Sequence, residues 1–154
     1  PHLYEFIWSS DLEISHVTLQ NSPFWTVHPV YVTGFTVHHV WILNPTNITN
    51  TDGIDPDSTS NVLIHDVYIR NGDDGIAIKS GWDEYGYEYG VPSSNITVRN
   101  CNITTPCAAF AIGSEMSGGV KDVFVEGCHF LDATAGVHIK SGAGRGGFVR
   151  DISF

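Results

Sequence analysis

One pattern of apolar residues recurs along the chain, and this repeat limits the folds that the chain can adopt. Two short segments alternate apolar and other residues, and a bend of two residues separates them. The pattern begins at residues 12, 35, 62, 96, 123 and 152, at intervals of 23, 27, 34, 27 and 29 residues. Such alternation predicts short strands with one buried face. A single repeat cannot bury that face, but stacked repeats form a continuous core, as in a solenoid.

A third strand is predicted in each repeat, over residues 74–80, 108–114 and 135–141, and residues 52–55 align with its start. No segment shows sustained helical periodicity. We therefore predict an all-β fold, a right-handed single-stranded parallel β-helix. A β-sandwich is the alternative because it also uses short strands. The constant phase of the repeat favours the β-helix.

Bulk composition excludes several classes of protein. The chain is 42% hydrophobic and 16% charged, which is typical of a globular protein. No apolar run approaches the roughly 20 residues of a membrane helix, so no membrane partner is expected. The formal charge is −10 and no basic stripe is present, which argues against nucleic-acid binding. Both ends interrupt the pattern, so we interpret residues 1–154 as one β-helix segment of a longer catalytic domain, truncated at both ends, whose full-length form is a monomer.

The sequons indicate where the protein is located, and the cysteines raise the question of a disulfide. Three Asn-Ile-Thr sequons, at Asn47, Asn95 and Asn102, indicate a secreted protein. Cys101 and Cys128 take the same inward position on successive repeats, where a disulfide is geometrically allowed. We favour two buried free thiols instead.

Three aspartates stand next to glycines, about one repeat apart: Asp52 in residues 50–55, and Asp73 and Asp74 in residues 71–76. Aligned residues on neighbouring coils of a parallel stack lie about 4.8 Å apart, so Asp52 and Asp74 are predicted to be vertical neighbours. Because like charges repel, at least one acid should hold its proton near neutral pH. A proton donor beside ionised acceptors is what general acid and base catalysis requires.

Two other interpretations of these acids stay open. The aspartates could be turn residues that cap loops beside glycine. Alternatively, Asp52, Asp55 and Asp57 could bind calcium, although their spacing does not match an EF-hand loop.

The two acidic segments resemble signature blocks of family 28 glycoside hydrolases, the polygalacturonases and their relatives. Four further blocks resemble the plant branch and its bacterial relatives: residues 22–25, 78–86, 112–119 and 144–147. The resemblance implies a right-handed parallel β-helix that hydrolyses α-1,4-galacturonosyl linkages in pectin with inversion. It also implies no cofactor and no metal, a pectic polysaccharide as the partner, and a location outside the cell or in the cell wall.

The resemblance also implies roles for the acids. Asp73 corresponds to the general acid, and Asp52 and Asp74 together would activate the water. Inversion needs roughly 6.5–9.5 Å between acid and base, so Asp73 is expected across the cleft from the other two.

Substrate binding is assigned to Asp55, Lys79, His138 and Lys140. With Arg145, the two lysines are predicted to form a positive patch for an acidic polymer.

The sequence departs from the family pattern at two places. Residues 107–109 read Cys-Ala-Ala where the family usually has Gly-His-Gly, and His138 stands where it usually has arginine. Arginine binds a carboxylate with two hydrogen bonds, whereas histidine makes one and is charged only when protonated. We therefore expect weaker binding of galacturonate or a different pectic backbone such as rhamnogalacturonan, and more activity at acid pH. A weakened homologue that binds without cutting, or a purely structural solenoid, remains an alternative.

Overall fold

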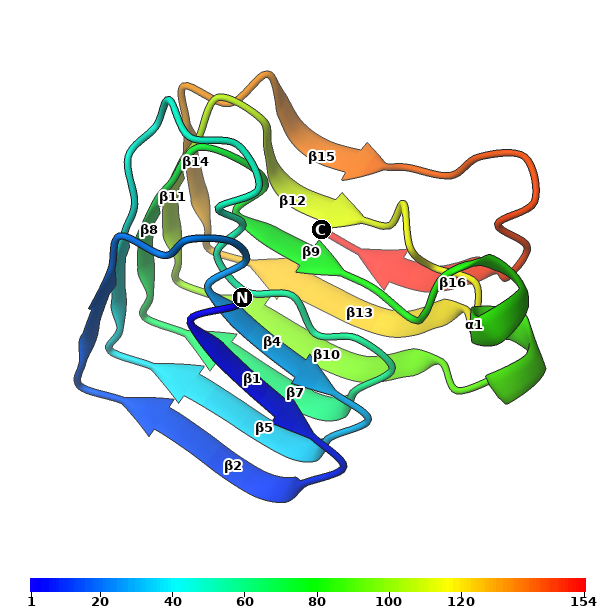
Figure 1. Ribbon diagram of the computed structural model, residues 1–154. Coiled ribbons are helices and arrows are strands. Elements are labelled where there is room, and N and C mark those ends of the chain that lie inside the picture. Colours follow the sequence, from blue (N-terminus) through cyan, green and yellow to red (C-terminus); the bar gives the residue numbers. More distant parts are fainter.

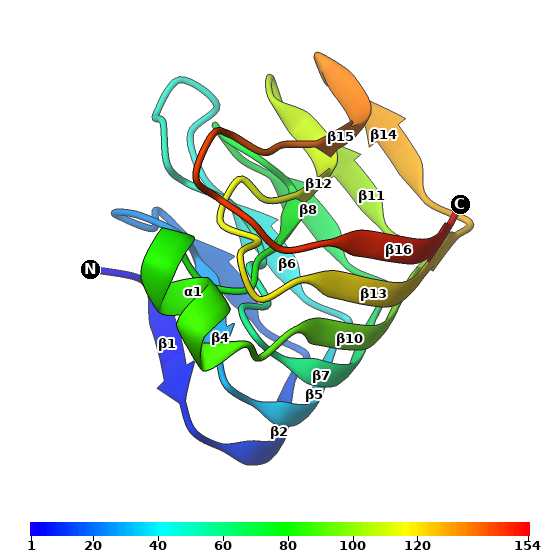
Figure 2. The ribbon, with the colours of Figure 1, turned by 90° about the vertical axis from the view of Figure 1, so that its right-hand side faces the viewer.

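The computed structural model describes residues 1–154 as a solenoid of parallel strands (Figure 1). One face is a six-stranded sheet in the order β16-β13-β10-β7-β5-β2. Its strands are β2 (Ser10–Ser15), β5 (Thr33–His38), β7 (Ser60–His65), β10 (Ser93–Arg99), β13 (Val120–Glu126) and β16 (Val149–Ser153). Figure 2 shows these strands stacked one above another along the solenoid.

A five-stranded sheet of three-residue strands forms the second face, in the order β14-β11-β8-β6-β3. Its strands are β3 (Thr18–Gln20), β6 (Trp41–Leu43), β8 (Tyr68–Arg70), β11 (Asn102–Thr104) and β14 (His129–Leu131). The third face holds β1 (Tyr4–Ile7), β4 (Val27–Val30), β9 (Ile76–Ile78), β12 (Ala108–Ile112) and β15 (Ala135–Ile139). Isolated bridges from Ile54 to Val27 and to Ile76 make residues 51–57 the coil between β4 and β9.

The observed register confirms the predicted β-helix. The first apolar positions of successive repeats pair with one another, from Leu12 through Phe35 and Val62 to Ile96, Val123 and Ile152. The core runs through the centre of the solenoid, where Phe35, Ile64 and Ile103 are fully buried. Each coil therefore hides its apolar edge against the coils above and below it.

The bend between the first two faces has a simple backbone cause. One residue in each bend adopts a left-handed conformation, with φ between 52° and 60°. The residues at this position are His16, His39, Asp66, Asn100 and Gly127. Histidine, aspartate, asparagine and glycine are the residue types that tolerate this region most readily, so the sequence accommodates the same corner on every coil.

A helix, α1 (Asp83–Tyr89), interrupts the stack, although no segment of the sequence shows sustained helical periodicity. It projects from the side of the solenoid (Figure 1) and ends at Gly90, whose φ is 62° and whose N–H donates to the Gly86 carbonyl. With seven residues it is shorter than the window in which helical periodicity can be read. No helix of the structure combines the length and the apolar character needed to cross a membrane.

The cysteines match the favoured prediction only in part, because Cys101 is buried and Cys128 is partly exposed. Asn102 pairs with His129, which places Cys101 and Cys128 in one column on successive coils. Both are free thiols, and Cys101 is buried.

Candidate active site

The three predicted acids meet on one side of the solenoid. Asp52 lies on the coil between β4 and β9, and Asp73 and Asp74 lie on the turn between β8 and β9. One carboxylate oxygen from each residue lies within 4.8 Å of the other two. The Gly53 N–H donates to the Asp74 carbonyl at 3.0 Å, which confirms that Asp52 and Asp74 are on neighbouring coils in register.

A buried asparagine holds the two acidic segments together. The Asn71 side-chain N–H₂ donates to the carbonyl of Thr51 at 3.0 Å and to that of Asp74 at 2.6 Å. The Thr51 hydroxyl in turn accepts the Gly72 N–H at 2.9 Å. Asn71 therefore fixes the backbone on both coils, one residue away from Asp52 and at Asp74 itself. This role was not predicted from the sequence, although Asn44 occupies the equivalent buried position one coil earlier.

Glycine is required where the two acidic coils touch. A Cβ on Gly53 would lie 2.4 Å from the Gly75 carbonyl oxygen, and a Cβ on Gly75 would lie 2.4 Å from the Ile103 side chain. Neither position has room for a larger residue. The glycines next to the acids therefore allow the close approach that brings the carboxylates together.

Asp73 and Asp74 are oriented by different partners. The Asp73 carboxylate accepts the backbone N–H of Asn50 at 2.8 Å and that of Asp74 at 2.9 Å. The Asp74 carboxylate accepts the Ala108 N–H at 3.1 Å and pairs with the Lys140 ammonium. One oxygen of the Asp73 carboxylate nevertheless lies within 4.8 Å of an oxygen of each of the other two acids. The expectation that Asp73 stands across the cleft from the other two acids is therefore wrong.

The surroundings of Asp52 raise its pKa. Burial raises its pKa from 3.8 to about 7, Lys79 opposes the rise, and the charges of Asp73 and Asp74 add to it. Asp55, completely buried behind Asp52, has a pKa well above its ordinary value because of burial and the neighbouring Asp52. Burial of Asp52 therefore favours a proton on at least one acid of the cluster, in line with the prediction.

Lys79 and Asp55 lie beneath the site and are inaccessible to a substrate. The Lys79 ammonium is 3.0 Å from a Glu115 oxygen, 3.7 Å from an Asp55 oxygen and 4.3 Å from the centre of the Trp25 ring. Burial opposes its charge, but the carboxylates of Asp55, Glu115 and Asp52 together raise its pKa. Both residues are buried, so the prediction that they bind substrate is wrong. Both residues instead interact electrostatically with Asp52.

Arg145 also has partners that the sequence did not indicate. Its guanidinium donates to Asp83 at 2.6 Å and to the Ser114 carbonyl at 2.9 Å, and it lies 5.0 Å from the Trp82 ring centre. The predicted positive patch of Lys79, Lys140 and Arg145 is wrong, because Lys79 is buried and Arg145 is paired with Asp83, which leaves Lys140 alone of the three in the pocket lining. Arg145 instead anchors the segment after β15 to the start of α1.

A pocket of about 280 Å³ opens in front of two of the acids. Its lining comprises Asp73, Asp74, Pro106, Cys107, Ala108, Thr134, Ala135, His138 and Lys140. Asp52 is absent from this lining and lies one coil before Asp74. The structure thus brings His138 and Lys140 to the acids, as the sequence predicted. A larger hollow of about 440 Å³ lies elsewhere, is lined mainly by apolar side chains such as Phe124, Phe130 and Phe154, and contains none of these acids.

Fold and site together define a class: a right-handed parallel β-helix protein with a carboxylate cluster of the kind that glycosidases use. The sequence profile of glycosyl hydrolases family 28 matches residues 1–154. The chain belongs to this family.

Individual relatives agree with the family match. A probable polygalacturonase of Vitis vinifera is 48% identical over 153 residues, which cover 99% of this chain and 31% of that protein. An endo-polygalacturonase of Pectobacterium parmentieri is 33% identical over 156 residues and is covered to 36%. Among solved structures, an exopolygalacturonase from Thermotoga maritima superposes with a TM-score of 0.94 at 33% identity, covering 98% of this chain and 34% of that one. The chain thus spans about a third of the length of these relatives.

Proposed function

We propose that the full-length protein is an inverting glycoside hydrolase that cleaves α-1,4-galacturonosyl linkages in pectin. The observation that carries hydrolysis is the convergence of three aspartates beside one pocket, with one carboxylate oxygen from each within 4.8 Å of the others. This spacing is shorter than the roughly 6.5–9.5 Å typical of inverting enzymes, so inversion is proposed from membership of family 28 and not from the distance. Like charges at this separation destabilise the fold. Such a cluster is therefore explained by a catalytic role and not by a contribution to stability.

The proposed roles follow from where each acid lies. Asp73 faces the pocket and donates a proton to the departing glycosidic oxygen. Asp74, whose oxygens are held by Lys140 and by the Ala108 N–H, accepts the proton of the attacking water. Asp52 lies one coil before Asp74 and keeps a proton within the cluster near neutral pH.

An acidic sugar polymer fits the residues in front of the acids. Lys140 and, when protonated, His138 are the cationic groups in the pocket lining. The overall charge of −10 makes such local cations necessary for an anionic substrate. The curated relatives named as polygalacturonases, from a plant and a bacterium, support the same substrate class.

The setting of the protein is part of the proposal. The chain aligns with only about a third of the length of each relative. This supports a longer catalytic domain, of which residues 1–154 form one β-helix segment. We expect that protein to be a secreted monomer, outside the cell or in the cell wall. The three sequon asparagines, Asn47, Asn95 and Asn102, are all exposed and accessible to glycosylation.

The test measures reducing ends released from polygalacturonate by the full-length protein. We expect steady release by the wild type and its loss in Asp73→Asn. Asp122→Asn is the matched control, because Asp122 is an exposed aspartate on β13 outside the site. Equal release by Asp73→Asn and the control would refute the assignment of the acid.

One observation favours a second candidate. Ala108 and His138 line the pocket where the family pattern has histidine and arginine. A homologue that binds pectic polysaccharide without cutting it, or one that acts on rhamnogalacturonan, would follow from this change. Binding of polygalacturonate with no reducing ends released would support the binder, and release from rhamnogalacturonan alone would support the altered specificity.

A further inference from the structure

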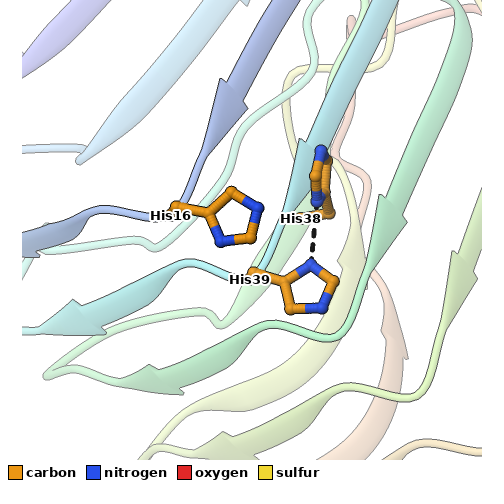
Figure 3. A group of neighbouring side chains, drawn as sticks. All are labelled: His16, His38 and His39. Atoms are coloured by element: carbon orange, nitrogen blue, oxygen red, sulfur yellow. Dashed lines mark hydrogen bonds between the residues drawn. The ribbon is translucent and has the colours of Figure 1, made fainter.

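A second cluster of side chains lies away from the acids, at the bend between the first two faces of the solenoid. It consists of His16, which follows β2, and of His38 and His39 at the end of β5 (Figure 3). One ring nitrogen of each lies within 4.8 Å of the other two. We refer to these three residues as the histidine cluster.

The fold itself places the three rings together. Ser15 pairs with His38 in the sheet, so His16 and His39 occupy the same left-handed corner on adjacent coils. Their rings stack with centres 4.9 Å apart and planes 20° apart. The His38 ring stands nearly perpendicular to both, with centres 5.4 Å and 5.1 Å away. The three nitrogens therefore converge through the backbone register and not through flexible side chains alone.

The hydrogen bonds of His38 favour an unprotonated Nδ1 atom inside the cluster. The Nδ1 atoms of His38 and His39 are 2.8 Å apart, so only one proton can lie between them. The other nitrogen of His38, Nε2, is 3.2 Å from a Glu13 oxygen. If Nε2–H donates to Glu13, Nδ1 of His38 is the unprotonated acceptor of the pair. A carboxylate behind a histidine, fixing its tautomer, is the arrangement found around metal-bound histidines.

Neighbouring charges also favour a cation at this corner. Glu13 lies on one side, and His65, which stacks on His38 at 5.1 Å with planes only 3° apart, is hydrogen-bonded to Asp66 at 2.6 Å. No lysine or arginine is among the partners of these histidines.

We propose that the histidine cluster binds one late first-row divalent transition metal ion, with zinc as the representative. Imidazole nitrogen is a preferred ligand of zinc, copper and nickel, whereas magnesium and calcium prefer oxygen. Three histidines leave a fourth position for water. The ion takes the place of the proton between the Nδ1 atoms of His38 and His39, and His39 then carries its proton on Nε2.

This site is separate from the acids. The histidines lie just before the short strands β3 and β6, and Asp73 and Asp74 lie just after β8, at the other end of the same sheet. Three-residue strands extend about 10 Å. An ion in the histidine cluster therefore does not touch the acid pocket, and the inference stands whether or not the proposed hydrolysis is correct.

The test is calorimetric titration of the EDTA-treated full-length protein with zinc chloride. We expect one zinc ion bound at this cluster and no heat from magnesium chloride. His16→Asn and His39→Asn should each weaken zinc binding by about tenfold or more, and Glu13→Gln should weaken it through the orientation of His38. Asparagine suits both positions because it tolerates the left-handed corner. His129→Asn, at an exposed histidine on β14, is the matched control.

A second measurement keeps the test decisive if a variant is less stable. Zinc should raise the melting temperature of the wild type and of His129→Asn, and leave that of His39→Asn unchanged. Zinc affinity that is equal in all four variants would overturn the inference. So would the absence of zinc binding in the wild type, or binding of magnesium as tight as that of zinc.

Discussion

Replacement of Asp52 with asparagine should make the protein more stable and less active, with a defined dependence on pH. Burial, together with Asp73 and Asp74 and against Lys79, raises the pKa of Asp52 from 3.8 to about 7. Each unit of difference in pKa between the folded and unfolded states is worth ~1.36 kcal/mol. Ionised Asp52 therefore costs the folded protein about 4 kcal/mol relative to the unfolded chain.

The sign of the effect follows from the two pKa values. Below a pH of about 4, Asp52 is neutral in both states and costs nothing. As the pH rises to about 7, the unfolded chain releases the proton and the folded protein keeps it, so the wild type loses stability. Asparagine has no such proton. The free energy of unfolding of Asp52→Asn should therefore exceed that of the wild type by almost nothing at low pH and by about 4 kcal/mol above neutrality.

The assay is urea denaturation of the full-length protein, followed by circular dichroism, at several pH values across this range. Asp122→Asn is the control, because its carboxylate is exposed and its replacement should change stability little at any pH. A difference between Asp52→Asn and wild type that stays constant with pH would refute the reasoning. It would mean that Asp52 ionises as readily in the folded protein as in the unfolded chain.

Four further outcomes follow from the same contacts. The pH profile of kcat/KM on polygalacturonate should fall as the pH rises through about 7, where Asp52 loses the proton that the cluster retains; a plateau extending well above neutrality would contradict this. Lys79→Met should destabilise the protein by about 3–5 kcal/mol in denaturation, because its buried carboxylate partners lose their cation; a change below about 1 kcal/mol would contradict it. His138→Arg should lower KM for oligogalacturonates, because a guanidinium binds a carboxylate with two hydrogen bonds and an imidazole with one; an unchanged KM would count against a role of His138 in binding. Gly75→Ala should lower the melting temperature, because its Cβ would lie 2.4 Å from the Ile103 side chain; an unchanged melting temperature would show that the coils can separate.

Much of the fold could be predicted because a solenoid repeats one local rule. The phase of the apolar residues fixed which positions stack, and the alignment of Asp52 with Asp74 followed from the constant offset between coils. The bend between the first two faces could also have been predicted from the sequence. Residues such as His16, His39 and Asp66 recur at the position where each coil needs a left-handed backbone.

The failures have a common physical origin. Periodicity indicates the side of a strand on which a residue lies, but not what covers that side. Lys79 was expected to be accessible, yet Glu115 and Trp25, both distant in sequence, enclose it. The position of Asp73 was inferred from a typical spacing of inverting enzymes, although its adjacency to Asp74 in the chain restricts the separation more strongly. Helix α1 is too short to show a helical period.

The most direct test of the proposed mechanism is the configuration of the first sugar released. Proton NMR of polygalacturonate mixed with the full-length protein should show the β-anomer first, with the α-anomer appearing later by mutarotation, and no product with Asp73→Asn. Early appearance of the α-anomer would mean retention, and would contradict the direct attack of an acid-activated water.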